Sequence, residues 1–255
     1  TLICELSTNA SFTMGPKTVI ISSHFALNFG FSNFIRGLLA GITSIIPISI
    51  GETVVIFLPL FLVILIVSLF IKPISDAAFD KISFRLSTLV VALYSLLAFS
   101  LAPAYGSSKA DALFGVNADA LSADELKSAA VILANETNAL ADEINFDYGS
   151  FSKMEYDFDV LTEKLLEAYD SLEEKYGFIG NFKSRLKPIA LSEAMTYTHI
   201  SGVYTYYTGE SNINTNFPDY TIPFTAAHEM AHQRGFAREN EANFVAFLVC
   251  MESND

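Results

Sequence analysis

Two histidines and a glutamate near the end of the chain have the spacing of a metal-site motif. The segment His228-Glu229-Met230-Ala231-His232 reads HExxH. Positions i and i+4 of a helix share a face, so both imidazoles can converge on one ion while Glu229 reaches a water beside it. Catalytic zinc sites use such nitrogen ligands and keep one position for water. The motif therefore predicts a helix that binds Zn2+, with Glu229 as a general base and not as a ligand.

A third ligand requires the chain to turn after this helix. Glu239 follows His232 by seven residues, and a continuous helix would separate them by about 10 Å, too far for ligands about 2 Å from one ion. Gly235 is the expected end of the helix, because glycine enters the left-handed conformation at little cost. A second helix should begin near Arg238 or Glu239. The residues that it is expected to pack on a core are Ala242, Phe244, Phe247 and Leu248.

Two neighbours of Glu239, Arg238 and Glu241, are weaker candidates for the third metal ligand. The pattern HExxHxxGxxH would need a histidine where the chain has Arg238, and a guanidinium cannot ligate zinc. Glu241 is the other carboxylate within reach, and it can equally be a solvated charge on the helix face. With Glu239 as the preferred ligand, Asn243 lies one turn further on and can hydrogen-bond a zinc-binding histidine. Zinc is expected, although such ligands discriminate poorly among divalent metals. The predicted metal ligands are His228, His232 and Glu239.

The first half of the chain contains long apolar runs. Residues Thr53 to Ile71 carry no charge, over a length that can cross a bilayer core of about 30 Å, and Leu86 to Ala102 form a shorter run. We expect two transmembrane helices, with buried core helices as the alternative and Pro59 as a tolerated kink. The connection from Lys72 to Arg85 holds three basic residues and is expected to be cytoplasmic by the positive-inside rule.

The remainder of the chain is acidic. From Pro103 onward there are 24 acidic and 10 basic residues, which is net −14 by subtraction, against −13 for the whole chain. Without a basic stripe, nucleic-acid binding is disfavoured. We expect residues 51–102 to form the membrane part and residues 103–255 an extracytoplasmic domain, so the protein would be a multi-pass protein of a bacterial cell membrane.

Residues 1–50 are expected to be an N-terminal region with an interfacial amphipathic helix. Helical spacing of apolar residues continues up to Pro47. Those residues are Ile35, Leu38, Leu39, Ile42, Ile45 and Ile46. The chain starts without methionine and lacks a signal-peptide pattern, so we expect a truncated N terminus. Cys4 and Cys250 are not expected to bind zinc or to form a disulfide framework, and Cys250 should be a buried thiol.

The acidic region combines helices with one clear strand. Helices are expected over Ser122–Asn145, where Ser122 and Glu125 form a capping box, and over Tyr156–Tyr176. Residues Gly202–Thr208 are β-branched and aromatic and should form a strand that ends at Gly209. The expected fold class is α+β, mainly α: N-terminal transmembrane helices, then a zincin-like domain with a small sheet and the HExxH helix.

A sheet edge beside such a helix can hold a peptide substrate as an added strand. The segments Tyr204–Thr208 and Asn212–Asn216 are the candidates, and an ordinary structural strand is the equal alternative for each. His199 and the tyrosines are candidate donors to an oxyanion, but no spacing rule selects one of them.

Several segments also carry a family resemblance, specific over about Lys183 to Glu252. They are Lys187-Pro188, SGVY at 201–204, TGESNIN at 208–214, PFTAAHEMAHQRGF at 223–236, ENEANF at 239–244 and, more weakly, ISIGE at 48–52. These segments resemble the bacterial membrane family "domain of unknown function 3810". The resemblance implies a membrane zinc metallopeptidase with N-terminal spans and a gluzincin-like domain.

The resemblance has two further implications. Glu239-x-x-Ala242-Asn243 is similar to the ExxA[DN] segment of gluzincins, whose leading glutamate binds zinc, which favours Glu239 over Glu241. Members also have one more N-terminal span and a further helical region after the motif. The chain is therefore expected to be a fragment that lacks part of its anchor and part of the active-site wall. The family implies no particular substrate.

The expected function is a membrane-anchored zinc metallopeptidase. Its partners would be a peptide or protein substrate and the lipid bilayer, with no nucleic acid, and the oligomeric state is not predicted. A membrane sensor or scaffold that keeps the zinc fold without turnover is the alternative, although the intact Glu229 argues against it. A purely structural zinc site would favour four closed ligands, usually including cysteine.

Overall fold

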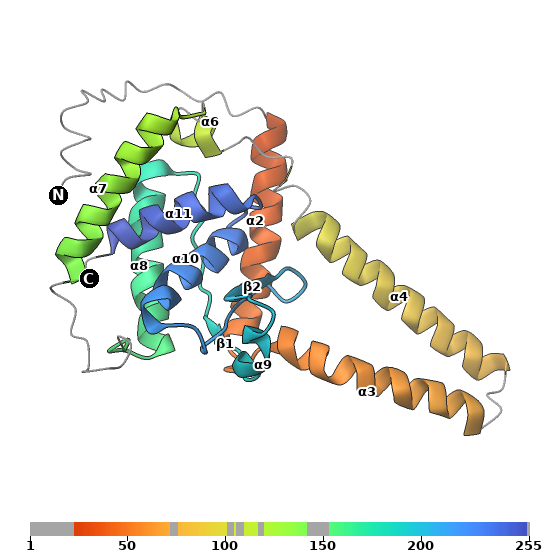
Figure 1. The fold of residues 1–255 in the computed structure, drawn as a ribbon. Coiled ribbons are helices and arrows are strands. Elements are labelled where there is room, and N and C mark those ends of the chain that lie inside the picture. Colours follow the sequence, from red (N-terminus) through yellow and green to blue (C-terminus); the bar gives the residue numbers. More distant parts are fainter. Residues whose placement is uncertain are drawn as a thin grey trace.

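The computed structural model describes residues 23–71, 76–100, 105, 110–116, 120–141 and 153–253. Most of the elements are helices, and one small sheet lies in the C-terminal half (Figure 1). In chain order the elements are α2 (Ser23–Ser44), α3 (Ile50–Ile71), α4 (Asp76–Ser100), α6 (Ala110–Phe114), α7 (Ala123–Ala141), α8 (Phe158–Tyr176), β1 (Lys187–Pro188), α9 (Ser192–Thr196), β2 (Gly202–Thr205), β3 (Glu210–Ile213), the 3-10 helix η1 (Asp219–Thr221), α10 (Ile222–Gln233) and α11 (Glu239–Glu252). The prediction of a mainly helical α+β fold with a small sheet is confirmed.

The sheet has three strands in the order β1-β3-β2, with β1 parallel and β2 antiparallel to β3. The predicted strand over Gly202–Thr208 is shorter than expected. It ends at Thr205, because the chain turns back through Gly209, which has a φ of 71°, into β3. Asn212 lies in the central strand, so of the two alternatives left open for Asn212–Asn216 the ordinary structural strand is the one that the structure shows, over Asn212 and Ile213. The edge strand next to the metal motif is β2.

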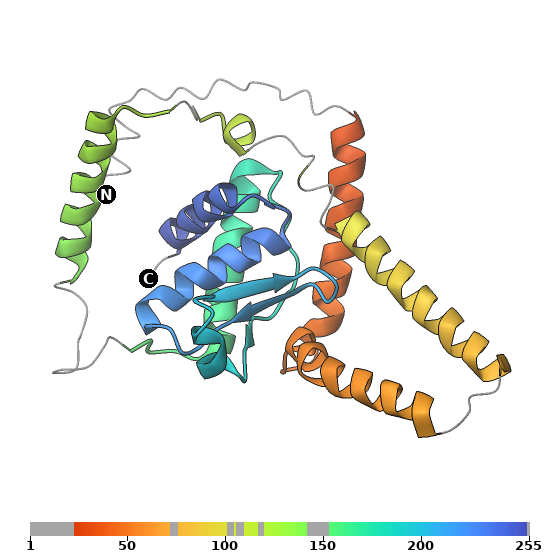
Figure 2. The ribbon, with the colours of Figure 1, turned by 45° about the vertical axis from the view of Figure 1, so that its right-hand side comes forward.

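The helix α10 is packed between this sheet and the pair α8 and α11 (Figure 2). Its apolar side belongs to the core, which extends through α8 and α11. The hydroxyl of Tyr169 on α8 donates a hydrogen bond of 2.8 Å to the carbonyl of Ala227 on α10. On α11 the fully buried residues differ from the predicted set in part: they are Ala242, Val245, Ala246 and Val249, with Phe244 and Leu248 only partly buried.

The helices predicted in the acidic region are confirmed where the structure describes them. Ser122 accepts and donates hydrogen bonds with Glu125 ahead of α7, as the capping box requires, and residues 142–145 lie outside the described part. The side chain of Asp157 caps α8 by accepting hydrogen bonds of 3.0 Å from the backbone nitrogens of Asp159 and Val160. Gly177 ends α8 in the left-handed conformation.

Two buried charged side chains of the sheet form hydrogen bonds with the backbone at the corner between α2 and α3. Lys187 on β1 donates from Nζ to the carbonyl oxygens of Thr43, at 2.8 Å, and Ile46. Glu210 on β3 accepts hydrogen bonds from the backbone nitrogens of Ile50, at 3.1 Å, and Gly51, at 2.9 Å. These charges therefore satisfy the last carbonyls of α2 and the first N–H groups of α3.

The residues predicted to form an amphipathic helix lie at the end of a longer one. The helix α2 already begins at Ser23 and packs against β3 and α4. Its buried residues are Ser32, Arg36, Ala40 and Thr43, whereas Leu38 and Ile42 are exposed. The apolar stripe of α2 thus faces away from the core of the domain.

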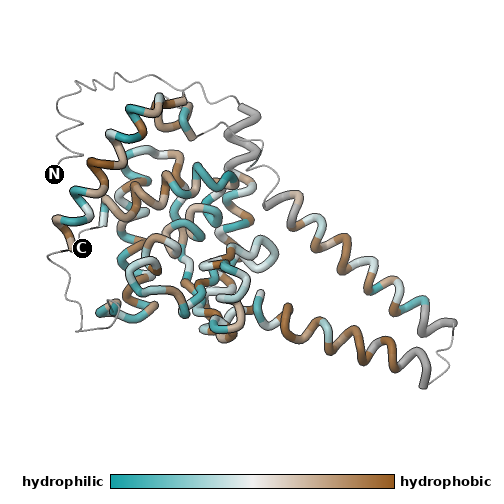
Figure 3. Tube along the Cα trace, in the orientation of Figure 1, coloured by the Kyte–Doolittle hydropathy of each residue, from teal (hydrophilic) through white to brown (hydrophobic). Residues whose placement is uncertain are grey.

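The helices α3 and α4 form a hairpin that projects from the rest of the molecule (Figure 1), and α3 is its most apolar part (Figure 3). No helix among the described residues is long and apolar enough to cross a membrane, so the two predicted transmembrane helices are not supported. The predicted loop over Lys72–Arg85 is also corrected, because α4 begins at Asp76 and includes Lys81 and Arg85. Pro59 lies inside α3 without ending the helix.

Candidate metal centre

The helix α10 carries the HExxH residues on the face toward β2. It follows a single turn of 3-10 helix and begins with Pro223 in its first turn, where the missing N–H costs nothing. Ala227 and Ala231 point into the core with no exposed surface. One face is therefore fixed by packing, and helical spacing leaves His228 and His232 side by side, with ring centroids 4.6 Å apart.

A tight turn brings the third predicted ligand back to these histidines. Gly235 has a φ of 105°, which strongly favours glycine. The backbone nitrogen of Phe236 then donates to the carbonyl of Ala231 at 3.1 Å, and an extended Arg238 leads into α11, which begins at Glu239. The turn predicted from the position of Gly235 is confirmed.

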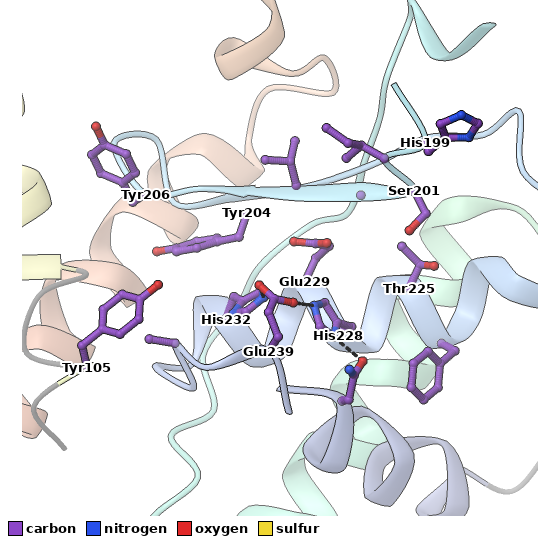
Figure 4. Close-up of a pocket in the computed structure, with 16 residues that line it drawn as sticks. Tyr105, His199, Ser201, Tyr204, Tyr206, Thr225, His228, Glu229, His232 and Glu239 are labelled. Carbon is purple, nitrogen blue, oxygen red and sulfur yellow. Dashed lines mark hydrogen bonds and ion pairs between the residues drawn. The ribbon is translucent and has the colours of Figure 1, made fainter. Parts of the chain in front are cut away.

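The three predicted ligands converge on one point (Figure 4). The Oε2 atom of Glu239 lies 3.2 Å from Nε2 of His228, and Oε1 lies 3.5 Å from Nε2 of His232. All three ligand atoms lie within 4.8 Å of one another. Both imidazoles are largely covered, whereas the carboxylate is 78% exposed. The cluster therefore opens to the solvent on the side of Glu239.

Glu241, the alternative ligand, is engaged elsewhere. Its Oε1 atom accepts hydrogen bonds from the backbone nitrogen of Ala110, at 3.1 Å, and from Nη1 of Arg238, at 2.9 Å. The residue is 6% exposed, so it is neither a solvated charge nor part of the cluster. Its contacts join α6 to the start of α11.

Hydrogen bonds on the far side of each imidazole orient the rings. Nδ1 of His232 lies 2.7 Å from the carbonyl oxygen of Phe236, which can only accept, so Nδ1 carries the proton and the lone pair is on Nε2. Nδ1 of His228 lies 2.9 Å from Oδ1 of Asn243, the contact expected from the sequence. Burial and the neighbouring His228 lower the pKa of His232. The Nε2 atoms of both rings thus face Glu239, an arrangement that fits a divalent cation.

Glu229 is buried beside the cluster, beneath β2. It is 6% exposed, and burial raises its pKa to about 8, with a smaller contribution from the charge of Glu239 in the same direction. A hydrogen bond with the backbone of Tyr204 acts in the opposite direction. The raised pKa makes the carboxylate form of Glu229 a stronger base than that of an exposed glutamate.

Gly202 lets the strand come this close. A Cβ atom at this position would lie 2.8 Å from Cγ and Oε1 of Glu229 and 2.8 Å from Cγ2 of Thr225. Only glycine fits without displacing the carboxylate. Glycine inside a strand is itself a sign of close approach, so Gly202 is the sequence signal for the short distance between β2 and Glu229.

The cluster lies in an open cleft of about 570 Å³. One wall is the edge strand β2. The carbonyl of Ser201 accepts a hydrogen bond of 2.9 Å from the nitrogen of Asn214, so the N–H of Gly202 in the same peptide unit points away from β3, toward the free edge. The lining includes Tyr105, His199, Ser201, Gly202, Tyr204, Tyr206, Phe224, Thr225, His228, Glu229, His232, Glu239 and Asn243.

Tyr105 lines the cleft although no sequence pattern connects it with the motif. It lies more than a hundred positions before the motif, and no local pattern marks it. Only the fold brings it to the cleft, where Nη2 of Arg238 donates a hydrogen bond of 2.9 Å to its carbonyl oxygen.

Comparison with known proteins gives a family and no close relative of known activity. The family model described as "Protein of unknown function (DUF3810)" matches residues 28–255. No curated protein and no solved structure matches the chain.

Proposed function

The chain belongs to the family described as Protein of unknown function (DUF3810), and because that description assigns no activity, we propose from the site itself that the chain is a zinc-dependent metallopeptidase. One observation carries the proposal: one nitrogen from each of His228 and His232 and a carboxylate oxygen of Glu239 lie within 4.8 Å of one another, with the buried Glu229 beside them. The three ligands alone would also suit a structural ion. The buried carboxylate of Glu229, which is not one of the ligands, needs another role.

The donor set supports zinc as the metal. Two histidines and one carboxylate are typical of catalytic zinc sites, whereas structural sites usually have four protein ligands that include cysteine. When bound, zinc would polarise the substrate carbonyl and lower the pKa of water toward 7. His228, His232 and Glu239 would hold it, and Asn243 and the carbonyl of Phe236 would keep the rings in place.

Glu229 has the environment of a general base. Its carboxylate accepts the proton of the attacking water as the water oxygen bonds to the peptide carbonyl carbon. The same carboxylic acid then gives that proton to the amine nitrogen as the C–N bond breaks. Burial raises the pKa of Glu229 to about 8, which strengthens its carboxylate as a base relative to an exposed glutamate. The backbone of Tyr204 and the narrow space under Gly202 hold the carboxylate in one orientation.

The free edge of β2 supports a peptide as the substrate class. An extended peptide can pair with a strand edge through main-chain hydrogen bonds, and the N–H of Gly202 points toward that edge. The edge runs along the wall of the cleft that contains Glu229 (Figure 4). A peptide bound there would have its carbonyl groups beside the cluster.

We also propose that α3 attaches the protein to a lipid bilayer. Between Thr53 and Ile71 it has no charged residue, and the apolar side chains that the structure describes from Val54 to Val67 are all exposed. Those exposed by more than half include Val55, Phe57, Leu60, Phe61, Val63, Ile64 and Ile66. Hydrocarbon is the environment that such a surface favours over water.

The ligand assignment is tested by zinc titration of three proteins freed of metal with a chelator. Glu239→Gln should bind zinc at least ~10-fold more weakly than the wild type, since a neutral amide is a poor zinc ligand. Glu241→Gln is the matched control on the same helix. It should bind one equivalent with wild-type affinity, because its amide oxygen still accepts from Ala110 and Arg238. A loss of affinity in Glu241→Gln with none in Glu239→Gln would refute the site.

A further inference from the structure

The cleft holds one aromatic hydroxyl that the proposed mechanism does not yet use. Tyr105 lines the cleft, and its side chain is 55% exposed. In Figure 4 the ring extends into the cleft on the side of His232, with the hydroxyl foremost. The hydroxyl is therefore accessible to a molecule bound in the cleft beside the candidate ligands.

The backbone of Tyr105 is fixed to the turn that presents the third ligand. Arg238, the residue directly before Glu239, donates from Nη2 to the carbonyl of Tyr105 and from Nη1 to Oε1 of Glu241, both at 2.9 Å. The same Glu241 oxygen accepts from the nitrogen of Ala110 at 3.1 Å. Arg238 and Glu241 thus connect the backbone of Tyr105 and that of Ala110 to the start of α11, and Arg238 positions Tyr105 relative to Glu239.

In Figure 4, Glu229 lies between β2 and the candidate ligands, and Tyr105 lies at the end of the cleft on the side of His232. A water activated by Glu229 attacks the peptide carbonyl carbon from the β2 side. The electron pair of the C=O bond then moves to the carbonyl oxygen, which becomes an oxyanion. A hydrogen-bond donor stabilises this oxyanion only if it lies close to that oxygen.

The other candidate donors are less suitable. The hydroxyl of Tyr204 is buried without a partner among the described residues, so a substrate cannot reach it. The hydroxyl of Tyr206 points away from the cluster, and His199 lies at the far end of the cleft, with its ring turned outward (Figure 4).

Building on the proposed peptidase function, we propose that Tyr105 is a catalytic residue whose hydroxyl donates a hydrogen bond to the oxyanion formed at the scissile carbonyl. Arg238 is its positioning residue. No proton leaves Tyr105 in this step, because the hydroxyl stabilises charge and Glu229 carries the proton.

The test first finds, in a library of synthetic peptides, the one that the wild type cleaves fastest. It then compares Tyr105→Phe with the wild type on that peptide. Loss of one oxyanion donor costs about 10²-fold to 10³-fold in kcat, so kcat should fall by that factor while KM changes less than about threefold. Zinc binding should stay at one equivalent. Tyr197→Phe is the matched control, since Tyr197 is 84% exposed and lies outside the cleft, and it should behave as the wild type does.

A second readout does not depend on turnover. Calorimetry would measure binding of a phosphinic analogue of that peptide, in which the scissile amide is replaced by a tetrahedral PO2–CH2 group. Tyr105→Phe should weaken this binding about 10²-fold and leave the affinity for the cleaved product unchanged. In the double variant Tyr105→Phe with Arg238→Met, the affinity for the analogue should be close to that of Tyr105→Phe alone, because Arg238 acts through Tyr105.

The outcomes separate this inference from the proposed function. Wild-type kcat and analogue affinity in Tyr105→Phe would overturn the role of Tyr105 and leave the peptidase intact. A rise in KM alone would also overturn it, because Tyr105 would then bind the substrate without acting on the oxyanion. If the wild type with zinc cleaves no peptide, the proposed function fails, and this inference fails with it.

Discussion

Oδ1 of Asn243 lies 2.9 Å from Nδ1 of His228, one helical turn after the carboxylate that faces the opposite nitrogen of the same ring. The two residues of α11 therefore hold the imidazole between them: Glu239 at Nε2 and Asn243 at Nδ1. A ring fixed on both sides loses little freedom when a metal binds.

Asn243→Ala should lower zinc affinity by about 10-fold to 100-fold, the usual cost of losing a partner behind a metal-binding histidine. The measurement is a zinc titration against a competing chelator. Asn240→Ala is the matched control, because Asn240 is an exposed asparagine in the first turn of the same helix. Equal affinities in the two variants would show that the contact does not support the site.

Gly202→Ala should damage hydrolysis and leave zinc in place. The added Cβ would lie 2.8 Å from Cγ and Oε1 of Glu229, so the base must move, and a displacement of about 1 Å can cost about 10²-fold in rate. The measurement is kcat together with the zinc content. Gly30→Ala is the control, because a Cβ at Gly30 meets no atom within 4 Å. Unchanged kcat in Gly202→Ala would mean that the position of Glu229 under β2 does not matter.

The thiol of Cys250 should be slow to alkylate and strongly pH-dependent. Burial raises its pKa to about 11, so at pH 8 only about one thiol in a thousand is the reactive thiolate. In the Cys4→Ser background, the alkylation rate should rise about tenfold per pH unit from pH 8 to pH 10. An ordinary thiol would level off above about pH 9, and such a plateau would contradict the buried environment.

Exposed leucines of α3 should determine membrane attachment. Leu58→Asp combined with Leu62→Asp should move the protein from the membrane fraction to the soluble fraction, because charge in hydrocarbon is costly. The matched control is Leu126→Asp with Leu133→Asp on α7, where both leucines are also exposed. Equal fractionation of the two double variants would count against attachment through α3.

The convergence of His228, His232 and Glu239 could be predicted from the sequence because the elements that position them are local. His228 and His232 are related by helical spacing, Gly235 marks a turn that has few backbone solutions, and Asn243 follows Glu239 by one turn. These relationships span only 16 residues, so dihedral preferences and ligand distances were enough to fix them.

The rest could not be predicted because it depends on contacts between distant segments. Glu241 is engaged by Ala110, and Tyr105 reaches the cleft through Arg238. The central position of β3 depends on β1, a strand of two residues that carries no pattern of its own. For that reason the sequence left open whether Asn212–Asn216 was a free edge or an ordinary structural strand.

The central claim is tested most directly by comparing the wild type with Glu229→Gln in one assay of zinc content and peptide cleavage. The variant should bind one equivalent of zinc, as the wild type does, because Glu229 is not a ligand. Its cleavage rate should be about 10²-fold to 10⁴-fold lower, the usual contribution of a general base. Wild-type cleavage by Glu229→Gln would contradict the proposed mechanism.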